Sequence, residues 1–229
     1  MTRTNQMKAG RAEAKTRDGA PRRWAAFTLL ELLVVIGIIA LLAALLVPLT
    51  ALAVAKMKLS RAAVELTDLA TVIQNYKETK GFYPPDNPND VTQPPLFYEL
   101  NGTIFDPVAQ TYRPMYNTNL GITAIPAANL PLEFGVQGFV NTTQNPADNP
   151  VFSHNFSPSQ FTDDTNSTLL IKYKILVCPI VHLDGTINPY NYNSTNPTNN
   201  PNTFDLWVDI ISRGKTNRVC NWSVKPIVL

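Results

Sequence analysis

The sequence predicts an α+β fold in which one long N-terminal helix, with a hydrophobic half and an amphipathic half, packs on a C-terminal antiparallel β-sheet domain. Three observations lead to this prediction. An apolar run with a single charge extends from Phe27 to Ala55. From Leu59 to Tyr76 apolar residues recur at spacings of three and four, which is the period of an amphipathic helix. Near the C-terminus apolar and polar residues alternate, as in half-buried strands.

The distribution of charge divides the chain into segments. The net charge of the 229 residues is +2, but the 26 residues before Phe27 hold seven basic and two acidic ones, and the remainder is net negative. We therefore expect a basic segment over 1–26, a hydrophobic helix of membrane-spanning length over 27–55, its amphipathic continuation over 56–81, and an outer β-rich domain over 82–229. The positive-inside rule keeps the basic end cytoplasmic.

Glu31 is the only charged residue between Phe27 and Ala55. A lone carboxylate near one end of an apolar helix is costly to bury and is usually retained for a partner charge. A signal peptide is disfavoured because Leu32–Ala55 is already longer than the 7–15 residues of its apolar core. A plain membrane anchor is long enough but gives Glu31 no role. One near-continuous helix from about Phe27 to Lys80 accounts for both halves and would be roughly 80 Å long.

Two residues are predicted to break or bend this helix. Pro48 removes a helix hydrogen bond and clashes with the preceding turn. Gly37 costs conformational entropy inside a helix. Gly81, which follows Lys80 and precedes two prolines, predicts the end of the helix.

The outer segment is expected to contain short strands joined by long loops. We predict a short helix at Leu96–Leu100 and a polar loop without a core at Asn188–Asn202. The predicted strands are Leu169–Val181, Phe204–Ile211 and Val219–Val224, the last two forming a hairpin around Arg213–Asn217.

The sequence offers little chemistry. Cys178 and Cys220 fall in the outer segment, where a disulfide can persist. We expect them to pair, which stabilises by roughly 4 kcal/mol in the chain-entropy model; two buried thiols are the alternative. The only histidines, His154 and His182, are too dispersed to suggest a metal site. No enzyme activity, metal or cofactor is expected.

The segment Ala26-Phe27-Thr28-Leu29-Leu30-Glu31, followed by a long apolar helix with Pro48, resembles the type IV prepilin class. This class includes type IV pilins and the pseudopilins of type II secretion. It has a phenylalanine, a glutamate and a proline at the spacing of Phe27, Glu31 and Pro48. Ala26 stands where the class usually has glycine.

The resemblance implies a prepilin, cut by the prepilin peptidase between Ala26 and Phe27 and then N-methylated on Phe27. Residues 1–26 would then be its leader peptide, and 27–55 its hydrophobic transmembrane and assembly helix. Glu31 of an incoming subunit would be attracted to the Phe27 amine of its neighbour during assembly. The implied partners are copies of the chain, related pilin-like subunits, the peptidase, an inner-membrane assembly platform and, before assembly, membrane lipid. The implied location is the bacterial inner membrane for the precursor, with one pass, and then a periplasmic or cell-surface fibre.

A weaker likeness favours the secretion branch of the class. The segment Gly81-Phe82-Tyr83-Pro84 resembles the end of the long helix in major pseudopilins. The segment from Phe204 to Trp222 resembles their C-terminal strand and loop, but three basic residues and no acidic one lie between Ser212 and Arg218, so no calcium site is carried over. An adhesive or DNA-uptake pilin, or a membrane-anchored extracytoplasmic binding domain, is the alternative. No nucleic-acid partner is expected, because Arg113 is the only basic residue between Gly81 and Ile171.

Overall fold

The computed structural model describes residues 27–116, 121–145, 147–148, 150–164, 172–180, 185 and 187–229, apart from the side chains of residues 45–49. The chain divides into two compact units, Met1–Pro48 and Leu49–Leu229. The helical elements are α1 (Leu29–Lys80), α2 (Leu96–Asn101), the 3₁₀ turn η2 (Ala127–Asn129) and α3 (Leu130–Glu133). The strands are β1 (Thr103–Asp106), β2 (Thr111–Pro114), β3 (Ile125–Pro126), β4 (Thr142–Thr143), β5 (Phe161–Asp163), β6 (Lys174–Leu176), β7 (Asn191–Asn193), β8 (Asp205–Ser212), β9 (Lys215–Cys220) and β10 (Ser223–Val228).

The second half of α1 buries one face in the larger unit. The apolar stripe predicted from the spacing is confirmed. Leu59 at its start is partly buried, and the other members are at most 6% exposed: Ala62, Leu66, Leu69, Ile73 and Tyr76. The helix ends where the sequence predicts. Gly81 has a φ of 87° and its N–H donates to the carbonyl of Lys77 at 2.7 Å. Glycine favours this left-handed position because it has no Cβ.

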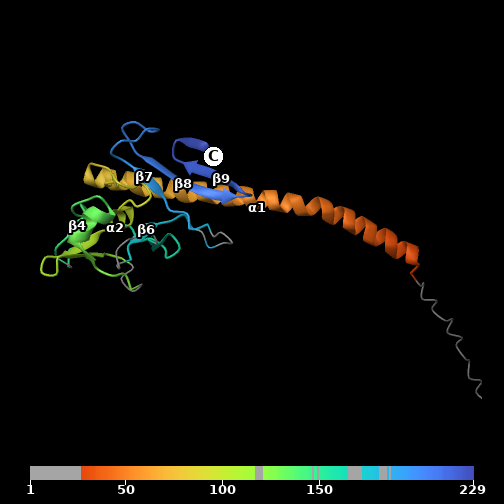
Figure 1. The fold of residues 1–229 in the computed structure, drawn as a ribbon, viewed down its shortest axis with the longest axis horizontal. Coiled ribbons are helices and arrows are strands. Elements are labelled where there is room, and N and C mark those ends of the chain that lie inside the picture. Colours follow the sequence, from red (N-terminus) through yellow and green to blue (C-terminus); the bar gives the residue numbers. More distant parts are fainter. Residues whose placement is uncertain are drawn as a thin grey trace, which may run out of the picture. The chain divides into compact units, whose positions relative to one another are not determined.

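The predicted fold class is wrong. The strands do not form one antiparallel sheet but three small ones, in the orders β3-β2-β1-β4, β10-β9-β8-β7 and β5-β6. Figure 1 shows β7, β8 and β9 of the second sheet beside one another. The first sheet is also mixed, because β1 and β4 run parallel. The predicted strand Leu169–Val181 lies partly outside the described residues, and its described part contains only the three-residue strand β6. Strands this short, separated by loops rich in Asn and Pro, leave no period of alternation to read in the sequence.

The long apolar helix half on which that fold class also depended is not supported either. Among the residues whose side chains are described, no helix is both long enough and apolar enough to cross a lipid bilayer. The predicted location, a single-pass precursor in the inner membrane, is therefore wrong as far as the described chain shows.

The C-terminal hairpin is present, but its second strand is shifted from the prediction. The predicted strand Val219–Val224 instead covers the end of β9, a turn at residues 221–222 and the start of β10, and the predicted turn Arg213–Asn217 narrows to Arg213 and Gly214. Strand β8 pairs with β9 in antiparallel register from Trp207 opposite Cys220 to Ser212 opposite Lys215. The two residues between the strands, Arg213 and Gly214, have φ values of 54° and 71°, and a type I′ turn needs positive φ at both. The alternating residues Phe204, Leu206, Val208 and Ile210 are buried as predicted, and this face joins the stripe of α1 in one core.

A buried carboxylate joins α1 and α2 to the segment before β4. Glu99 is fully buried. Its Oε2 accepts hydrogen bonds from the hydroxyl of Tyr76 at 3.0 Å and the N–H of Asn141 at 2.9 Å, and its Oε1 accepts the N–H of Val140 at 2.8 Å. Three donors compensate the carboxylate for the loss of water, so the burial is tolerated. Burial nevertheless raises the pKa of Glu99.

The Asn-rich stretch predicted to lack a core is ordered by Asp205. This residue is 2% exposed. Its Oδ2 accepts the backbone N–H groups of Thr198 and Asn199, both at 2.9 Å, and its Oδ1 accepts that of Asn200 at 2.8 Å. Earlier in the same stretch Tyr190 and Tyr192 are buried, and Tyr192 is the middle residue of β7.

Replacing Asp205 with alanine should destabilise the fold by about 2–4 kcal/mol, because three backbone N–H groups lose together the buried carboxylate that holds this segment. The matched control is Asp209→Ala on the same strand. The Asp209 carboxylate pairs with Arg218 at 2.8 Å, and both side chains are about one third exposed, so its loss should cost no more than about 1 kcal/mol. Urea unfolding followed by circular dichroism measures both, and equal losses would contradict the assigned role of Asp205.

Candidate functional site

The N-terminus of α1 is closed by a reciprocal pair of side chains. The Oε2 atom of Glu31 accepts hydrogen bonds from the backbone N–H and the hydroxyl of Thr28, both at 2.9 Å. In return the N–H of Glu31 donates to the Oγ1 of Thr28 at 3.2 Å. This is a capping box, with threonine at the N-cap and glutamate three residues later. It satisfies backbone donors that have no partner within the helix.

The capping box sets the charge state of Glu31. The backbone and side-chain hydrogen bonds from Thr28 lower the pKa of Glu31 below its ordinary value. The carboxylate is therefore ionised at neutral pH, and the contribution of the cap is present above the ordinary glutamate pKa and lost as the pH falls through the lowered one. Among the described residues only Oε2 receives hydrogen bonds, which leaves Oε1 open to a further cation.

The apolar side chains that follow this cap are uncovered. Phe27 is 78% exposed, Leu29 84% and Leu30 71%. The remaining large apolar side chains described in this part of α1 are 45–65% exposed: Leu32, Leu33, Val34, Val35, Ile36, Ile38, Ile39, Leu41, Leu42, Leu52 and Val54. Scattered exposed apolar residues are normal, but the unbroken series from Phe27 to Leu42 marks an interaction site.

The predicted helix breaks do not occur. The backbone of α1 is helical without interruption through both Gly37 and Pro48. A Cβ built on Gly37 would meet nothing within 4 Å, so no close approach requires glycine there. The boundary between the two compact units nevertheless falls directly after Pro48.

The predicted disulfide is also wrong, because Cys178 and Cys220 are free and buried. Cys178 lies in contact with the hydroxyl of Tyr190, and burial raises its pKa to about 11. Burial likewise raises the pKa of Cys220, which ends strand β9. Neither thiol therefore has the thiolate character of a reactive cysteine.

Several sequence-predicted residues lie outside the described part of the chain. Ala26, with the predicted cleavage bond, is one, and His182 is another. Phe27 and Glu31 are both described: Phe27 lies just before α1, and Glu31 lies in its first turn. Thr28 was missed, although the spacing Thr28-x-x-Glu31 is a recognisable capping signal. Within the described residues no cluster of His, Cys, Asp and Glu could hold a metal ion.

Comparison with known proteins identified no relative of this chain. No family model, curated protein or solved structure matches the chain.

Proposed function

We propose that this chain is a structural subunit of a pilus or pseudopilus, made as a prepilin and assembled through the N-terminal part of α1. The observation that carries the proposal is the uncovered apolar surface from Phe27 to Leu42, with one ionised carboxylate, Glu31, close to its start. If these side chains pack against the same side chains of other subunits, association is stabilised by about 25 cal/mol for each Å² of apolar surface removed from water.

Glu31 gives this association a register. Once the leader is removed, Phe27 carries a free amine, and the ammonium of one subunit can meet Oε1 of Glu31 on another. An ion pair enclosed by apolar side chains strongly disfavours any arrangement that leaves one partner unpaired. The pair therefore selects one axial offset between neighbouring helices, whereas the apolar surface alone would permit many.

Within this class we favour the fibre of a type II secretion system. The support is the segment Gly81-Phe82-Tyr83-Pro84 at the end of α1, where Gly81 adopts the left-handed conformation that ends the helix. A bridge between Cys178 and Cys220 would have favoured an adhesive or DNA-uptake pilin, and both thiols are free.

Processing is the first prediction to test. The protein isolated from its own cells should begin at Phe27 and carry one methyl group on the amine, as read by N-terminal sequencing and intact mass. Replacing Ala26 with a bulky charged residue should leave the protein at precursor size. An intact leader in the wild-type protein, or a start elsewhere in the chain, would contradict the proposal.

A further inference from the structure

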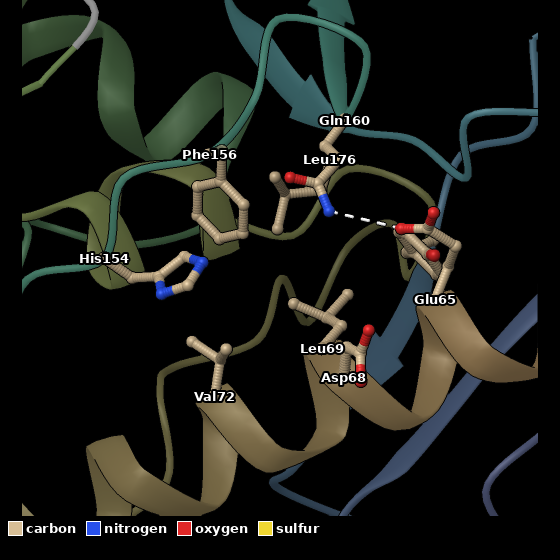
Figure 2. Close-up of a pocket in the computed structure, with 9 residues that line it drawn as sticks. Glu65, Asp68, Leu69, Val72, His154, Phe156, Gln160 and Leu176 are labelled. Atoms are coloured by element: carbon tan, nitrogen blue, oxygen red, sulfur yellow. Dashed lines mark hydrogen bonds between the residues drawn. The ribbon is translucent and has the colours of Figure 1, made fainter.

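A cleft of about 300 Å³ lies between the second half of α1 and the segment that precedes β5 (Figure 2). It belongs entirely to the larger unit and is independent of the proposed assembly surface. Its volume is at the lower end of the range for small-molecule sites. The residues that line it are Glu65, Asp68, Leu69, Val72, His154, Phe156, Gln160, Leu176 and Tyr190.

The middle of the cleft is apolar. Leu69, Phe156 and Leu176 are at most 6% exposed, and their side chains lie on its walls. The imidazole of His154 lies edge-on to the ring of Phe156, with 4.7 Å between the ring centroids. Figure 2 shows both rings on the same side of the cleft, away from the carboxylates. This side therefore suits a flat aromatic body.

The opposite side of the cleft is acidic. Glu65 and Asp68 are one helical turn apart on α1 and both carboxylates lie at this side (Figure 2). The Nε2 of Gln160 donates to Oε2 of Glu65 at 3.2 Å, which holds that carboxylate in place. Arg61 lies 3.9 Å from the other oxygen of Glu65, but its side chain is 63% exposed, so solvent screens this pair. Asp68 is exposed to solvent and interacts electrostatically with Tyr190, and no described residue forms a hydrogen bond or ion pair with it.

The other polar group at the cleft is neutral. Burial lowers the pKa of His154, so its imidazole carries no charge at neutral pH. None of the described residues that line the cleft is cationic. The cleft thus combines an apolar, partly aromatic interior with net negative charge at one side only.

We propose that this cleft binds a small aromatic amine, with its ammonium group paired to Asp68 and Glu65 and its ring against Phe156 and Leu69. The ligand class follows from the lining, because an anion would meet two carboxylates, whereas an ammonium group can pair with them while its ring covers the apolar walls. The Nε2 of Gln160 donates to Glu65 and is not directed at Asp68. A cationic group on the ligand is therefore what would pair with the carboxylates at this side of the cleft.

Calorimetric titration of the full chain in non-ionic detergent tests this, with 2-phenylethylamine as the probe. The matched probes are 2-phenylethanol, which lacks the charge, n-butylamine, which lacks the ring, and 3-phenylpropionate, which reverses the charge. We expect 2-phenylethylamine to bind about fivefold or more tightly than either the alcohol or butylamine, and the acid not to bind. Equal affinity for the amine and the alcohol, or no saturable binding of the aromatic amine, would overturn the proposal.

Single substitutions locate the site. Asp68→Asn keeps the size of the side chain and should weaken binding of 2-phenylethylamine by about fivefold while leaving that of the alcohol unchanged. Glu78→Gln, an exposed carboxylate further along the same helix that does not line the cleft, is the control and should have no effect. If both substitutions weaken binding equally, the amine is attracted by the overall negative charge of the helix and does not bind in this cleft, and the proposal is wrong. If butylamine binds as tightly as the aromatic amine, the site takes lysine-like aliphatic amines and the aromatic assignment is wrong.

Discussion

Replacing Glu99 with alanine should lower the free energy of unfolding by about 3–5 kcal/mol, the largest stability effect we expect from a single side chain. The change leaves three donors without an acceptor in the core: the hydroxyl of Tyr76 and the N–H groups of Val140 and Asn141. It also leaves a cavity between α1 and α2. Urea unfolding of the full chain, followed by circular dichroism, measures the loss, and Glu78→Ala on the exposed side of α1 should change it by no more than about 0.5 kcal/mol.

The same carboxylate should make stability depend on pH. Burial, the main influence on Glu99, raises its pKa, while the bonds from Val140, Asn141 and Tyr76 oppose that shift without cancelling it. A carboxyl group whose folded pKa is raised contributes stability that is complete below its unfolded pKa, about 4.3, and declines as the pH rises through the folded value. The free energy of unfolding should therefore fall across the range above pH ~4.3.

Glu99→Gln separates this charge effect from packing. The amide keeps the size of the side chain but directs an NH₂ group at a backbone N–H, so the variant should be less stable than the wild type at every pH. Its stability should no longer decline through the range in which Glu99 titrates. A wild-type profile that is flat there, or a glutamine variant that keeps the same slope, would contradict the assignment.

The sequence predicts those parts of the fold that depend on local periodicity. The stripe from Ala62 to Tyr76 repeats every three or four residues and is buried, and the alternation from Phe204 to Ile210 is buried on one face. The short helix expected at Leu96–Leu100 is present as α2. In each case the pattern and the burial involve residues close together in the chain, so a local reading suffices.

The parts that depend on distant contacts could not be read. Asp86 fixes the Asn-rich stretch by accepting the N–H groups of Ser194 and Thr195, more than a hundred positions away in the chain. The thiol of Cys178 meets the hydroxyl of Tyr190 and not Cys220. The division of the strands into three sheets has the same origin, since the strands from β1 to β7 have only two to four residues and take their partners from tertiary packing.

At the candidate site the sequence identified the unusual residue but not what it does in the free subunit. Glu31 was predicted from its cost as a lone charge among apolar residues. Its role as a helix cap required Thr28, whose hydroxyl completes the box. Pro48 and Gly37 were expected to interrupt the helix, yet its backbone is continuous through both. Pro48 removes one backbone hydrogen bond and Gly37 lacks a side chain, and each costs the helix only a few kcal/mol or less, at most about 3 kcal/mol.

Replacing Glu31 with alanine should leave processing at Phe27 intact and reduce fibre assembly by at least tenfold, which is the largest functional effect we expect. Without the carboxylate, the Phe27 ammonium of a neighbouring subunit would be enclosed among apolar side chains with no counter-charge. The measurement is the amount of sheared fibre recovered per processed subunit. Glu78→Ala, which removes an exposed carboxylate further along α1, should leave the yield unchanged.

Because Glu31 both caps the helix and is proposed to pair between subunits, two further variants are needed to separate these roles. Glu31→Gln preserves the capping box, since glutamine also serves at this position, but removes the charge. Thr28→Ala removes the hydroxyl of the cap and keeps the charge. If the intersubunit ion pair governs assembly, the glutamine variant should be as defective as the alanine variant at position 31, and Thr28→Ala should assemble nearly as well as the wild type. The reverse ranking would show that Glu31 acts by ordering the start of α1, and the proposed pairing with the Phe27 amine would then be wrong.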